Sequence, residues 1–550
     1  MPIPNVESES MERTASALAL STPQTRSGTR VTASSRGLRR APFAVLILIV
    51  GGLGLRIWLA ALPVGAFDGD EATTGLMARQ ILHGHFYTYM AGQTYNGALE
   101  QYLQAIVWAF APQNIWTLRA VDFGLYAITA VAVYHVGKLY FSSTWRPVVA
   151  TGVFCLGPYF NIWKSIHSHG AYSIGQLIGV VALLAAAHLR GDEHDRSRDF
   201  AVLGLMAGLA VWLSWSSFLL IIPACFWALP SLRRSPKKLA YAVPAALLGA
   251  YPTIVWMVTK WRIPGLGESQ PPTTILRRLA NLFDPISREL IGVGYRYGKP
   301  GLPVVLQIPI VIAIGVAIIG CLIKRRHVLR ACLVGRADAS RRPPDALLYV
   351  VPIALVAYAA SQYAWWTGEP RYLFVLYPAL ALAVAAIPTP KGNRKVLLGG
   401  IAITLSLTST VTTVLEHAQD GPRDEVGCLS RITAGLTARG INHVYSDYWT
   451  GMPLQMVAGN RLVVAPVGGG RAKFPSLRKT VDSDSPIFYL AGHLPDQTDK
   501  DPDNVAAIRK ALKSHDVSAK QTPIGGCAVL FSDFTPNVRP WQIDIGQSMR

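Results

Sequence analysis

Three carboxylates stand close together in the segment Asp68-Gly69-Asp70-Glu71. Asp70 suits the N-cap of a helix and Glu71 its first turn, where backbone N–H groups and the helix dipole favour negative charge. Capping accounts for one carboxylate but not for three. A carboxylate beside a hydroxyl group can take its proton while the oxygen attacks a carbon atom, and neighbouring groups can tune its pKa for that task. The segment therefore has the chemistry of a general base.

The stretch after this cluster is rich in polar aromatic and amide side chains. Tyrosine rings offer flat apolar faces and amides match sugar hydroxyls, so such a stretch suits carbohydrate binding. Aromatic residues also form ordinary belts at membrane interfaces, and both interpretations stay open. The residues concerned are Tyr87, Tyr89, Gln93, Tyr95 and Asn96.

The composition indicates that these residues are positioned by a protein of the lipid bilayer. Of the 550 residues, 51% are hydrophobic and only 15% are charged. The net charge of +20 forms no continuous basic face of the kind that binds nucleic acid. The lysines and arginines gather in short loops between apolar runs, as the positive-inside rule predicts. We therefore expect a multi-pass protein that contacts membrane lipids and no nucleic acid.

Eleven apolar runs are interpreted as membrane-spanning helices, for which about 20 residues are the usual length. Serines at 214, 216 and 217 divide the stretch 200–230, which predicts two short helices that turn there. With the N-terminus inside, this division places more than twice as many Lys and Arg residues in the inner segments as in the outer loops. The expected spans are 41–62, 116–137, 147–162, 171–189, 200–213, 216–230, 239–258, 302–323, 346–364, 372–388 and 396–415.

The long non-spanning segments all lie outside in this topology. Residues 1–40 are polar and are expected to form a disordered cytoplasmic tail. The transmembrane part covers 41–415, with long outer loops at 63–115 and 259–301. The inner loops between spans are too short for a nucleotide-binding domain. We expect the protein in the plasma membrane, with the acidic cluster facing outward.

The C-terminal segment 416–550 is more polar and alternates between helix and strand patterns, which is typical of a small α/β domain. Outside the membrane, Cys428 and Cys527 could form a disulfide that closes a loop of about 100 residues, and two unpaired buried cysteines are the alternative. The expected elements are helices at 424–438 and 503–514 and strands at 443–447, 461–466, 486–491 and 527–532.

Short motifs follow the first expected span and precede a late one. The first set is Asp70-Glu71-Ala72, Gly75-Leu76-Met77-Ala78-Arg79, Gly92-Gln93 and Leu99-Glu100-Gln101-Tyr102. The second is Gly368-Glu369-Pro370-Arg371-Tyr372-Leu373 followed by Tyr377-Pro378-Ala379-Leu380. Together they resemble polyprenyl-phosphate-sugar-dependent transferases of the GT-C fold, a class that includes protein O-mannosyltransferases and aminoarabinose transferases. The resemblance covers about 41 to 390 and leaves out the C-terminal segment.

This resemblance implies a polytopic α-helical GT-C fold in which Asp70 is the general base. Glu71 would assist it or bind the acceptor. Asp68 is additional to the simplest form of the motif, and we group it with Glu100 among the acceptor- or sugar-binding candidates. Most relatives of this architecture are thought to work without a metal, so none is expected to be required. Asp68 and Asp70 also look like the metal motif of nucleotide-sugar transferases, which keeps a divalent cation open.

A leaving phosphate needs positive charge nearby. Arg suits bidentate contact with phosphate, and Lys provides a point charge. For Arg371 the alternatives are snorkelling or an ion pair with Glu369, and for the two histidines an ordinary polar loop. The candidates are Lys164, His167, His169, Arg371 and Arg79.

These expectations describe an enzyme. It would move a mannose- or arabinose-like sugar from a polyprenyl-phosphate carrier to a glycan, glycolipid or protein hydroxyl of the cell envelope. Nucleotide sugars are unavailable on the outer face, so the sugar must arrive on a lipid there. Attack opposite the phosphate would invert the anomeric centre. The alternatives are a flippase for lipid-linked glycans, which needs charges along a pathway through its spans, and a non-catalytic envelope scaffold.

Overall fold

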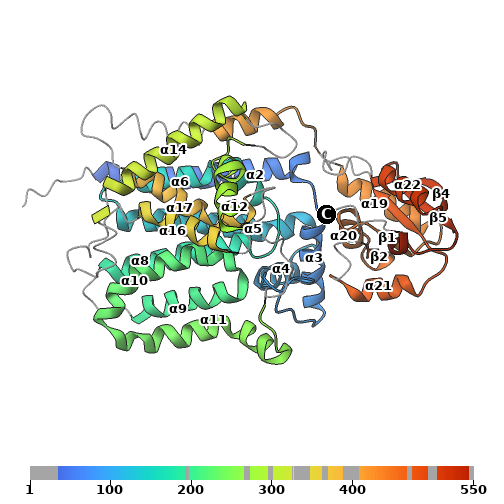
Figure 1. Ribbon diagram of the computed structural model, residues 1–550, viewed down its shortest axis with the longest axis horizontal. Helices are drawn as coiled ribbons and strands as arrows, with labels where there is room; N and C mark the ends of the chain where they lie inside the picture. The colour runs from blue at the N-terminus through green and yellow to red at the C-terminus, as the bar shows by residue number, and fades with distance from the viewer. Residues whose placement is uncertain are drawn as a thin grey trace, which may run out of the picture.

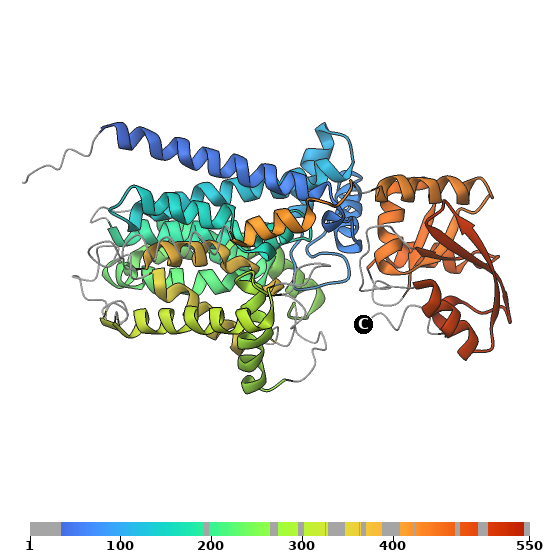
Figure 2. The same cartoon turned by 90° about the horizontal axis from the view of Figure 1, so that it is seen from above.

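The computed structural model is a bundle of long helices with a small α/β domain at one end (Figures 1 and 2). The N-terminal end of the first long helix lies at the opposite end of the bundle from this domain (Figure 2). The structure describes residues 35–191, 197–264, 273–294, 302–324, 326–327, 347–361, 364, 370–387, 408–422, 424–467, 473–492 and 504–543.

Five helical segments of the described chain are long and apolar enough to cross a membrane. Their length follows from runs of 19 to 26 apolar residues, since 1.5 Å per residue carries such a helix through the hydrocarbon core. The chain is therefore a multi-pass membrane protein, as predicted. The segments are Ala41–Ala60 of α2 (Ser35–Ala60), α5 (Ile115–Tyr140), Tyr172–Arg190 of α8 (Tyr172–Gly191), Trp215–Arg234 with α10 (Phe218–Arg234), and Pro236–Lys260 with α11 (Leu239–Lys260).

The predicted division of 200–230 is confirmed. Helix α9 (Ser197–Leu213) ends before Ser214, whose side chain accepts a hydrogen bond from the backbone N–H of Ser216 at the start of a 3-10 turn (Trp215–Ser217). Helix α10 begins after this turn and packs against both α9 and α8. Serine side chains that bond to the local backbone favour such turns over a continuous helix.

Several other expected spans differ from the prediction. The run 147–162 is not one helix but two, α6 (Trp145–Cys155) and α7 (Tyr159–Lys164), because proline at 158 cannot continue α6 and fits only the start of α7. The later runs give α14 (Val304–Lys324), α16 (Leu347–Ala360) and α17 (Tyr377–Ala386). Most of 396–415 and all of 1–34 lie outside the described residues, so the expected eleven spans and the disordered tail stay predictions.

The two long loops that are expected to lie outside carry helices of their own. In 63–115 these are α3 (Gly69–Leu82) and α4 (Leu99–Phe110), which pack together at the end of the bundle that bears the α/β domain (Figure 1). In 259–301 they are α12 (Ile275–Asn281), a π-helical turn (Leu282–Ile286) and α13 (Ser287–Leu290).

The C-terminal domain is built on a five-stranded sheet with the order β2-β1-β3-β5-β4. Strand β1 pairs in parallel with β2 and β3, whereas β5 pairs antiparallel with β3 and β4. The sequence did not predict β4, α20 or α21. The strands are β1 (His443–Ser446), β2 (Val463–Pro466), β3 (Tyr489–Gly492), β4 (Ser518–Ile524) and β5 (Ala528–Thr535), and the helices α19 (Glu425–Thr437), α20 (Tyr448–Ala458), α21 (Pro475–Asp482) and α22 (Asn504–Ser514).

One hydrophobic core joins this domain to the loop 63–115. Met77 of α3 and Trp108 of α4 are buried in the same cluster as Met452 and Met456 of α20, and α20 packs along α3. Cys428 and Cys527, the expected pair, are joined in a disulfide with a Cα–Cα distance of 6.3 Å. The domain is thus docked on α3 through a shared apolar interface.

Candidate active site

The acidic cluster lies at the start of α3. Asp68 is the N-cap, rather than Asp70 as expected, and its side chain accepts a hydrogen bond of 2.9 Å from the backbone N–H of Glu71. Asp70 and Glu71 occupy the first turn, where the helix dipole favours negative charge. Helical geometry turns consecutive side chains about 100° apart, so the three carboxylates reach different partners instead of one another.

Glu71 is completely buried and forms a bidentate ion pair with Arg119 of α5. Nε and Nη2 of Arg119 lie 2.6 Å from Oε1 and Oε2 of Glu71, and the backbone N–H of Ser168 also donates to Oε1. Arg119 further donates to the carbonyls of Ala60 and Gly65. Burial raises the pKa of the Glu71 carboxyl, but Arg119 outweighs it and holds the pKa well below its usual range. Sequence reasoning missed Arg119 because it lies inside an expected span.

Asp68 is linked to Lys164 through His169. Nε2 of His169 lies 2.7 Å from Oδ2 of Asp68, and Nδ1 lies 2.7 Å from Nζ of Lys164. An ammonium group can only donate a hydrogen bond, so Nδ1 of His169 accepts one from Lys164. Nε2 of His169 therefore carries the ring hydrogen and donates a hydrogen bond to Asp68. Lys164 also stands over the ring of Tyr172 at 4.6 Å from its centroid. The two expected phosphate ligands Lys164 and His169 are thus brought together beside the acidic cluster.

His167 stacks on His169 with ring centroids 4.9 Å apart and lies 3.4 Å from Oε2 of Glu71. Its burial lowers the pKa to about 4, although Glu71 pulls the other way. The lowered pKa favours the neutral form of His167 near pH 7, and its role at a donor phosphate stays a prediction.

Asp68, His167 and His169 could together hold a divalent cation. One ligand atom from each lies within 4.8 Å of the others. Carboxylate oxygen and imidazole nitrogen suit zinc and related ions at about 2.0–2.2 Å, which places ligand atoms about 3.4 Å apart in a tetrahedral site. The Asp68–His169 contact of 2.7 Å is a hydrogen-bond distance. A cation would therefore have to replace this hydrogen bond and part the two side chains.

Asp70 is held by two residues of the C-terminal domain. Its Oδ1 lies 2.7 Å from Nζ of Lys473 and accepts a hydrogen bond of 2.6 Å from the hydroxyl of Tyr448. Burial raises the pKa of the Asp70 carboxyl, but Lys473, His169 and the hydrogen bonds from Lys473 and Tyr448 together bring it well below its usual range. Its side chain remains 28% exposed. No motif in the sequence pointed to Lys473 or Tyr448.

Comparison with known proteins identifies the fold. No protein-family model and no curated protein matches the chain. Among solved structures, ArnT from Cupriavidus metallidurans in the apo state matches with a TM-score of 0.56 at 12% identity, covering 92% of this chain and 99% of that chain. The chain has a GT-C fold. The predicted fold class is therefore confirmed.

Two further matches have lower TM-scores. ArnT from Cupriavidus metallidurans bound to undecaprenyl phosphate matches with a TM-score of 0.45 at 12% identity, covering 91% of this chain and 98% of that chain. The apo oligosaccharyltransferase of Archaeoglobus fulgidus matches with a TM-score of 0.46 at 13% identity, covering 82% of this chain and 69% of that chain.

A second group of polar residues lies behind the acidic cluster in this GT-C fold. Glu100, an expected acceptor-binding residue, is fully buried. The hydroxyl of Ser168 donates to Glu100 at 3.3 Å and to Oδ2 of Asp122 in α5 at 2.7 Å. Burial and then Asp122 raise the pKa of Glu100 well above its usual range. Glu100 thus accepts hydrogen bonds from the loop of Ser168 and Gly170, and its role in binding an acceptor or sugar stays a prediction.

The polar aromatic stretch after α3 is used mainly to anchor its own loop. Tyr89 is buried, donates to the hydroxyl of Thr253 at 2.9 Å and packs edge-on against Trp256 of α11. Asn96 donates to Gln93 at 2.8 Å. Tyr87 contacts Gln80 and Tyr102, and Tyr95 is half-buried. These contacts favour an anchoring role for the stretch.

Arg79 and Arg371 lie on separate elements from the cluster. Arg79 sits at the far end of α3, donates to Gln113 at 3.1 Å and to the Met456 carbonyl at 3.2 Å, and lines a cavity of 400 Å³ beside the C-terminal domain. Arg371 opens a 3-10 helix (Arg371–Leu376) that packs on α7 and α8, the helices on either side of the Lys164–His169 loop.

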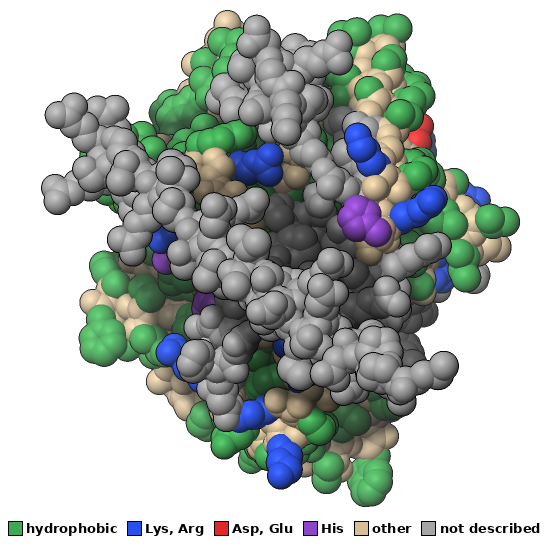
Figure 3. Space-filling model, turned by 90° about the vertical axis from the view of Figure 1, so that its left-hand side faces the viewer, with side chains coloured by type: hydrophobic (Ala, Val, Ile, Leu, Met, Phe, Trp, Pro, Cys, Tyr) green, Lys and Arg blue, Asp and Glu red, His purple; other side chains and the backbone are tan. Residues whose placement is uncertain are grey.

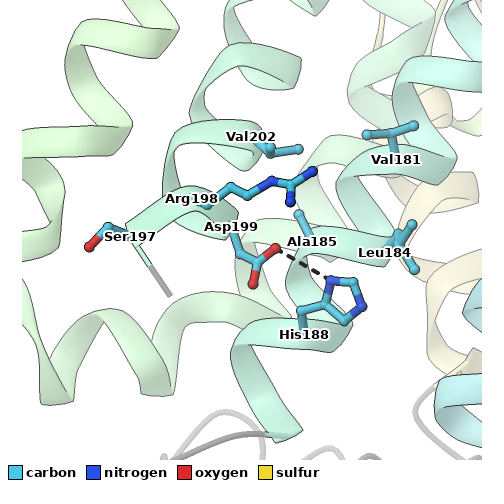
Figure 4. Close-up of a pocket in the computed structure, with 8 residues that line it drawn as sticks. All are labelled: Val181, Leu184, Ala185, His188, Ser197, Arg198, Asp199 and Val202. Carbon is cyan, nitrogen blue, oxygen red and sulfur yellow. Dashed lines mark hydrogen bonds and ion pairs between the residues drawn. The ribbon is translucent and has the colours of Figure 1, made fainter. Parts of the chain in front are cut away.

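A larger cavity of 620 Å³ lies between α8 and α9, and Figure 4 shows its lining. Nδ1 of His188 is 3.3 Å from Oδ1 of Asp199 at its edge. About 30 Å of helix separates this end of α8 from the end next to His169. The cavity shares no residue with the acidic cluster. Its lining consists of Val181, Leu184, Ala185, His188, Ser197, Arg198, Asp199 and Val202.

Proposed function

We propose that the protein is a membrane glycosyltransferase that takes a sugar from a polyprenyl-phosphate carrier and attaches it to an acceptor hydroxyl. The observation that carries the proposal is the setting of Asp70. It is a partly exposed carboxylate, ionised and held through one oxygen, at the start of α3 and at one end of a GT-C fold. Such a group can accept a proton from a hydroxyl.

In the proposed reaction Asp70 removes the acceptor proton through Oδ2. The acceptor oxygen forms a bond to the anomeric carbon as the bond from that carbon to the phosphate oxygen breaks, and the electron pair leaves on the phosphate. Attack opposite the phosphate inverts the anomeric centre. The ammonium group of Lys164, next to His169 and Asp68, and the guanidinium group of Arg371 would stabilise the phosphate.

Glu71 takes a supporting role in this proposal. Its carboxylate is fully buried and both its oxygens contact Arg119, so it fixes the first turn of α3 against α5 and does not touch the acceptor. The donor sugar is a mannose- or arabinose-like sugar, and the acceptor a glycan, glycolipid or protein of the cell envelope. No metal is required for the steps described.

We further propose that the acidic cluster and the C-terminal domain face outward from the plasma membrane, with the N-terminus in the cytoplasm. The opposite end of the bundle carries Lys and Arg side chains at several places (Figure 3). Arg233 and Arg234 are exposed at the end of α10, and the exposed Lys237 follows it. Positive charge is typical of the cytoplasmic side. The disulfide of the C-terminal domain also suits an oxidising compartment.

The charges inside the spans support an enzyme over a flippase. Arg56 of α2 donates to Ser165 at 2.6 Å, Arg119 pairs with Glu71, and Asp122 contacts Ser168. All three side chains therefore contact either the start of α3 or the loop after α7, at the proposed outer end of the bundle. A transport pathway would need such groups at successive depths of the membrane.

The proposal is tested by glycan analysis of cells that carry Asp70→Asn in place of the wild-type chain. The amide keeps the shape but cannot take the proton, so the glycan product should fall to the level of a deletion strain. Asp533→Asn is the matched control, because Asp533 is exposed at the far side of the domain and its positive φ of 54° suits asparagine. Normal product from Asp70→Asn at normal expression would refute the assignment.

A further inference from the structure

We propose that the C-terminal domain completes the active site, with Lys473 and Tyr448 as positioning residues that hold Asp70 through one carboxylate oxygen and leave the other for the acceptor. This inference rests on the proposed function, in which Asp70 is the base. It gives a role in the reaction to residues 416–550, which the sequence motifs do not cover.

Both domain residues bind the same oxygen of Asp70. Nζ of Lys473 and the hydroxyl of Tyr448 lie 2.7 Å and 2.6 Å from Oδ1. Within the described part of the chain, Oδ2 receives no hydrogen bond, and the side chain keeps 28% exposure. A general base needs this arrangement, because one oxygen must be fixed while the other presents a lone pair to the incoming hydroxyl.

The two positioning residues are themselves fixed by α3 and by each other. The hydroxyl of Tyr448 lies 3.0 Å from Oγ1 of Thr73, which in turn donates to the carbonyl of Gly69 at 2.7 Å. Nζ of Lys473 also contacts the Tyr448 hydroxyl and lies 4.1 Å from the centroid of its ring. Tyr448 is buried, so its hydroxyl has a single well-defined place above the first turn of α3.

Glycines in the first outer loop make room for this contact. A Cβ atom on Gly69 would lie 2.8 Å from both the ring and the backbone carbonyl oxygen of Tyr448. A Cβ atom on Gly92, whose φ is +75°, would lie 2.6 Å from Cγ of Lys473. At each of these positions any larger residue would push away one of the two positioning residues. Glycine at positions 69 and 92 therefore allows the C-terminal domain to dock with Tyr448 and Lys473 next to Asp70.

The positive charge of Lys473 also stabilises the ionised form of Asp70, which its surroundings otherwise disfavour. Asp68 is two residues away, and burial and a second carboxylate both favour the protonated form of Asp70. Lys473 and His169 are the positive or proton-donating groups that oppose them, and the Tyr448 hydroxyl stabilises the carboxylate by a hydrogen bond.

The test measures sugar transfer from a polyprenyl-phosphate-linked sugar against pH, using the full-length protein in nanodiscs. Lys473→Met should lower kcat about tenfold or more, because Asp70 loses its fixed orientation, with KM for the donor nearly unchanged. Tyr448→Phe should cause a smaller change in the same direction, and Lys473→Arg should restore part of the rate. Lys479→Met is the matched control, because Lys479 is exposed on α21 and loses the same charge.

A profile of Lys473→Met that matches Lys479→Met would overturn the inference. A change in KM alone would overturn it too, since Lys473 would then bind the donor and not position the base. A double-mutant cycle of Asp70→Asn and Lys473→Met on melting temperature separates this failure from failure of the proposed function. The two substitutions could be coupled in melting temperature while the wild-type protein transfers no sugar. That result would refute the proposed function and the positioning role of Lys473, although the contact between Lys473 and Asp70 would be confirmed.

Discussion

Asp70 and Glu71 are adjacent in the sequence, yet their surroundings give them different roles. Glu71 is fully buried and bound on both oxygens by a guanidinium group, whereas Asp70 is partly exposed and bound on one oxygen. A carboxylate that cannot reach solvent cannot meet an acceptor hydroxyl. At the scale of residues, we therefore propose that Asp70 carries the chemistry and that Glu71 holds the helix that presents it.

The buried ion pair leads to a prediction about Arg119. Arg119→Met should lower the stability of the protein by about 3–5 kcal/mol, because it leaves the Glu71 carboxylate buried without its partner. Thermal unfolding in nanodiscs measures the loss. Adding Glu71→Gln to Arg119→Met should recover much of it. Equal melting temperatures for the wild type and Arg119→Met would contradict the structural role of the pair.

His167 leads to a prediction about pH. Its pKa in the folded protein is about 4, below the usual value of about 6.5 in an unfolded chain. Between these two pKa values the unfolded state binds more protons than the folded state. The contribution of His167 to the free energy of unfolding is therefore fully present above about pH 6.5 and is lost as the pH falls. From pH 7 to pH 5 the wild type should lose up to about 2 kcal/mol more stability than His167→Gln.

Melting curves at the two pH values check this prediction, with His85→Gln as control because His85 is exposed. Glu71, Arg119 and His169 face His167 and remain in both proteins. An identical pH dependence for the wild type and His167→Gln would show that His167 is not held neutral.

The sequence could indicate the acidic cluster but not its partners. Asp70 was chosen from a short motif, and Lys164 and His169 from their place in a loop near it. Arg119 belongs to an apolar run and Lys473 to a segment about 400 positions away, so neither spacing nor composition connects them with α3. Contacts between distant segments depend on the tertiary packing, which local patterns do not contain.

At the scale of elements, the start of α3 depends on a close contact with α20. Gly69→Ala places a Cβ atom 2.8 Å from the backbone oxygen of Tyr448, and backbone cannot move aside as a flexible side chain can. We expect this variant to displace Tyr448 and lower sugar transfer by an order of magnitude or more. The transfer rate and the melting temperature are the measurements.

Gly54→Ala is the control for this variant. Gly54 lies in α2, and a Cβ atom there would meet nothing within 4 Å. Alanine is also favoured over glycine in a helix by up to about 1 kcal/mol, so this variant should be as stable as the wild type or slightly more stable. Activity of Gly69→Ala equal to that of Gly54→Ala would show that the contact does not position Tyr448.

The elements were predictable where local chemistry decides them. The turn at Ser214 was found because serines compete with the helix for backbone hydrogen bonds. The break before α7 was missed, although Pro158 marks it, because a run of apolar residues was given more weight than one proline. Strand β4 was missed because its side chains are mostly exposed and show little apolar alternation.

At the scale of the whole molecule, the fold places a small α/β domain on the loop 63–115 at one end of a membrane bundle (Figure 2). The membrane class and the GT-C fold were predictable from composition and motifs, and the docking of the domain on α3 was not. The shared core of α3, α4 and α20 fixes the domain beside the acidic cluster, as the proposed role of Lys473 and Tyr448 requires.

The disulfide gives a prediction at this scale. Removing it with Cys428→Ser and Cys527→Ser frees a loop of 99 residues in the unfolded state, which corresponds to a loss of about 4–5 kcal/mol in the chain-entropy treatment. The melting temperature of the C-terminal domain should fall and become insensitive to reducing agent. Cys225→Ser should leave both unchanged, because Cys225 is a free cysteine on α10. Insensitivity of the wild type to reductant would contradict the prediction.

The most direct test of the central claim is sugar transfer by the purified protein. Wild-type protein and Asp70→Asn, each shown to be folded by its melting curve, are given a labelled polyprenyl-phosphate-linked mannose or arabinose and a cell-envelope acceptor in nanodiscs. We expect the wild type to release polyprenyl phosphate and label the acceptor, and Asp70→Asn to do so at least a hundredfold more slowly. Equal rates for the two folded proteins would contradict the account.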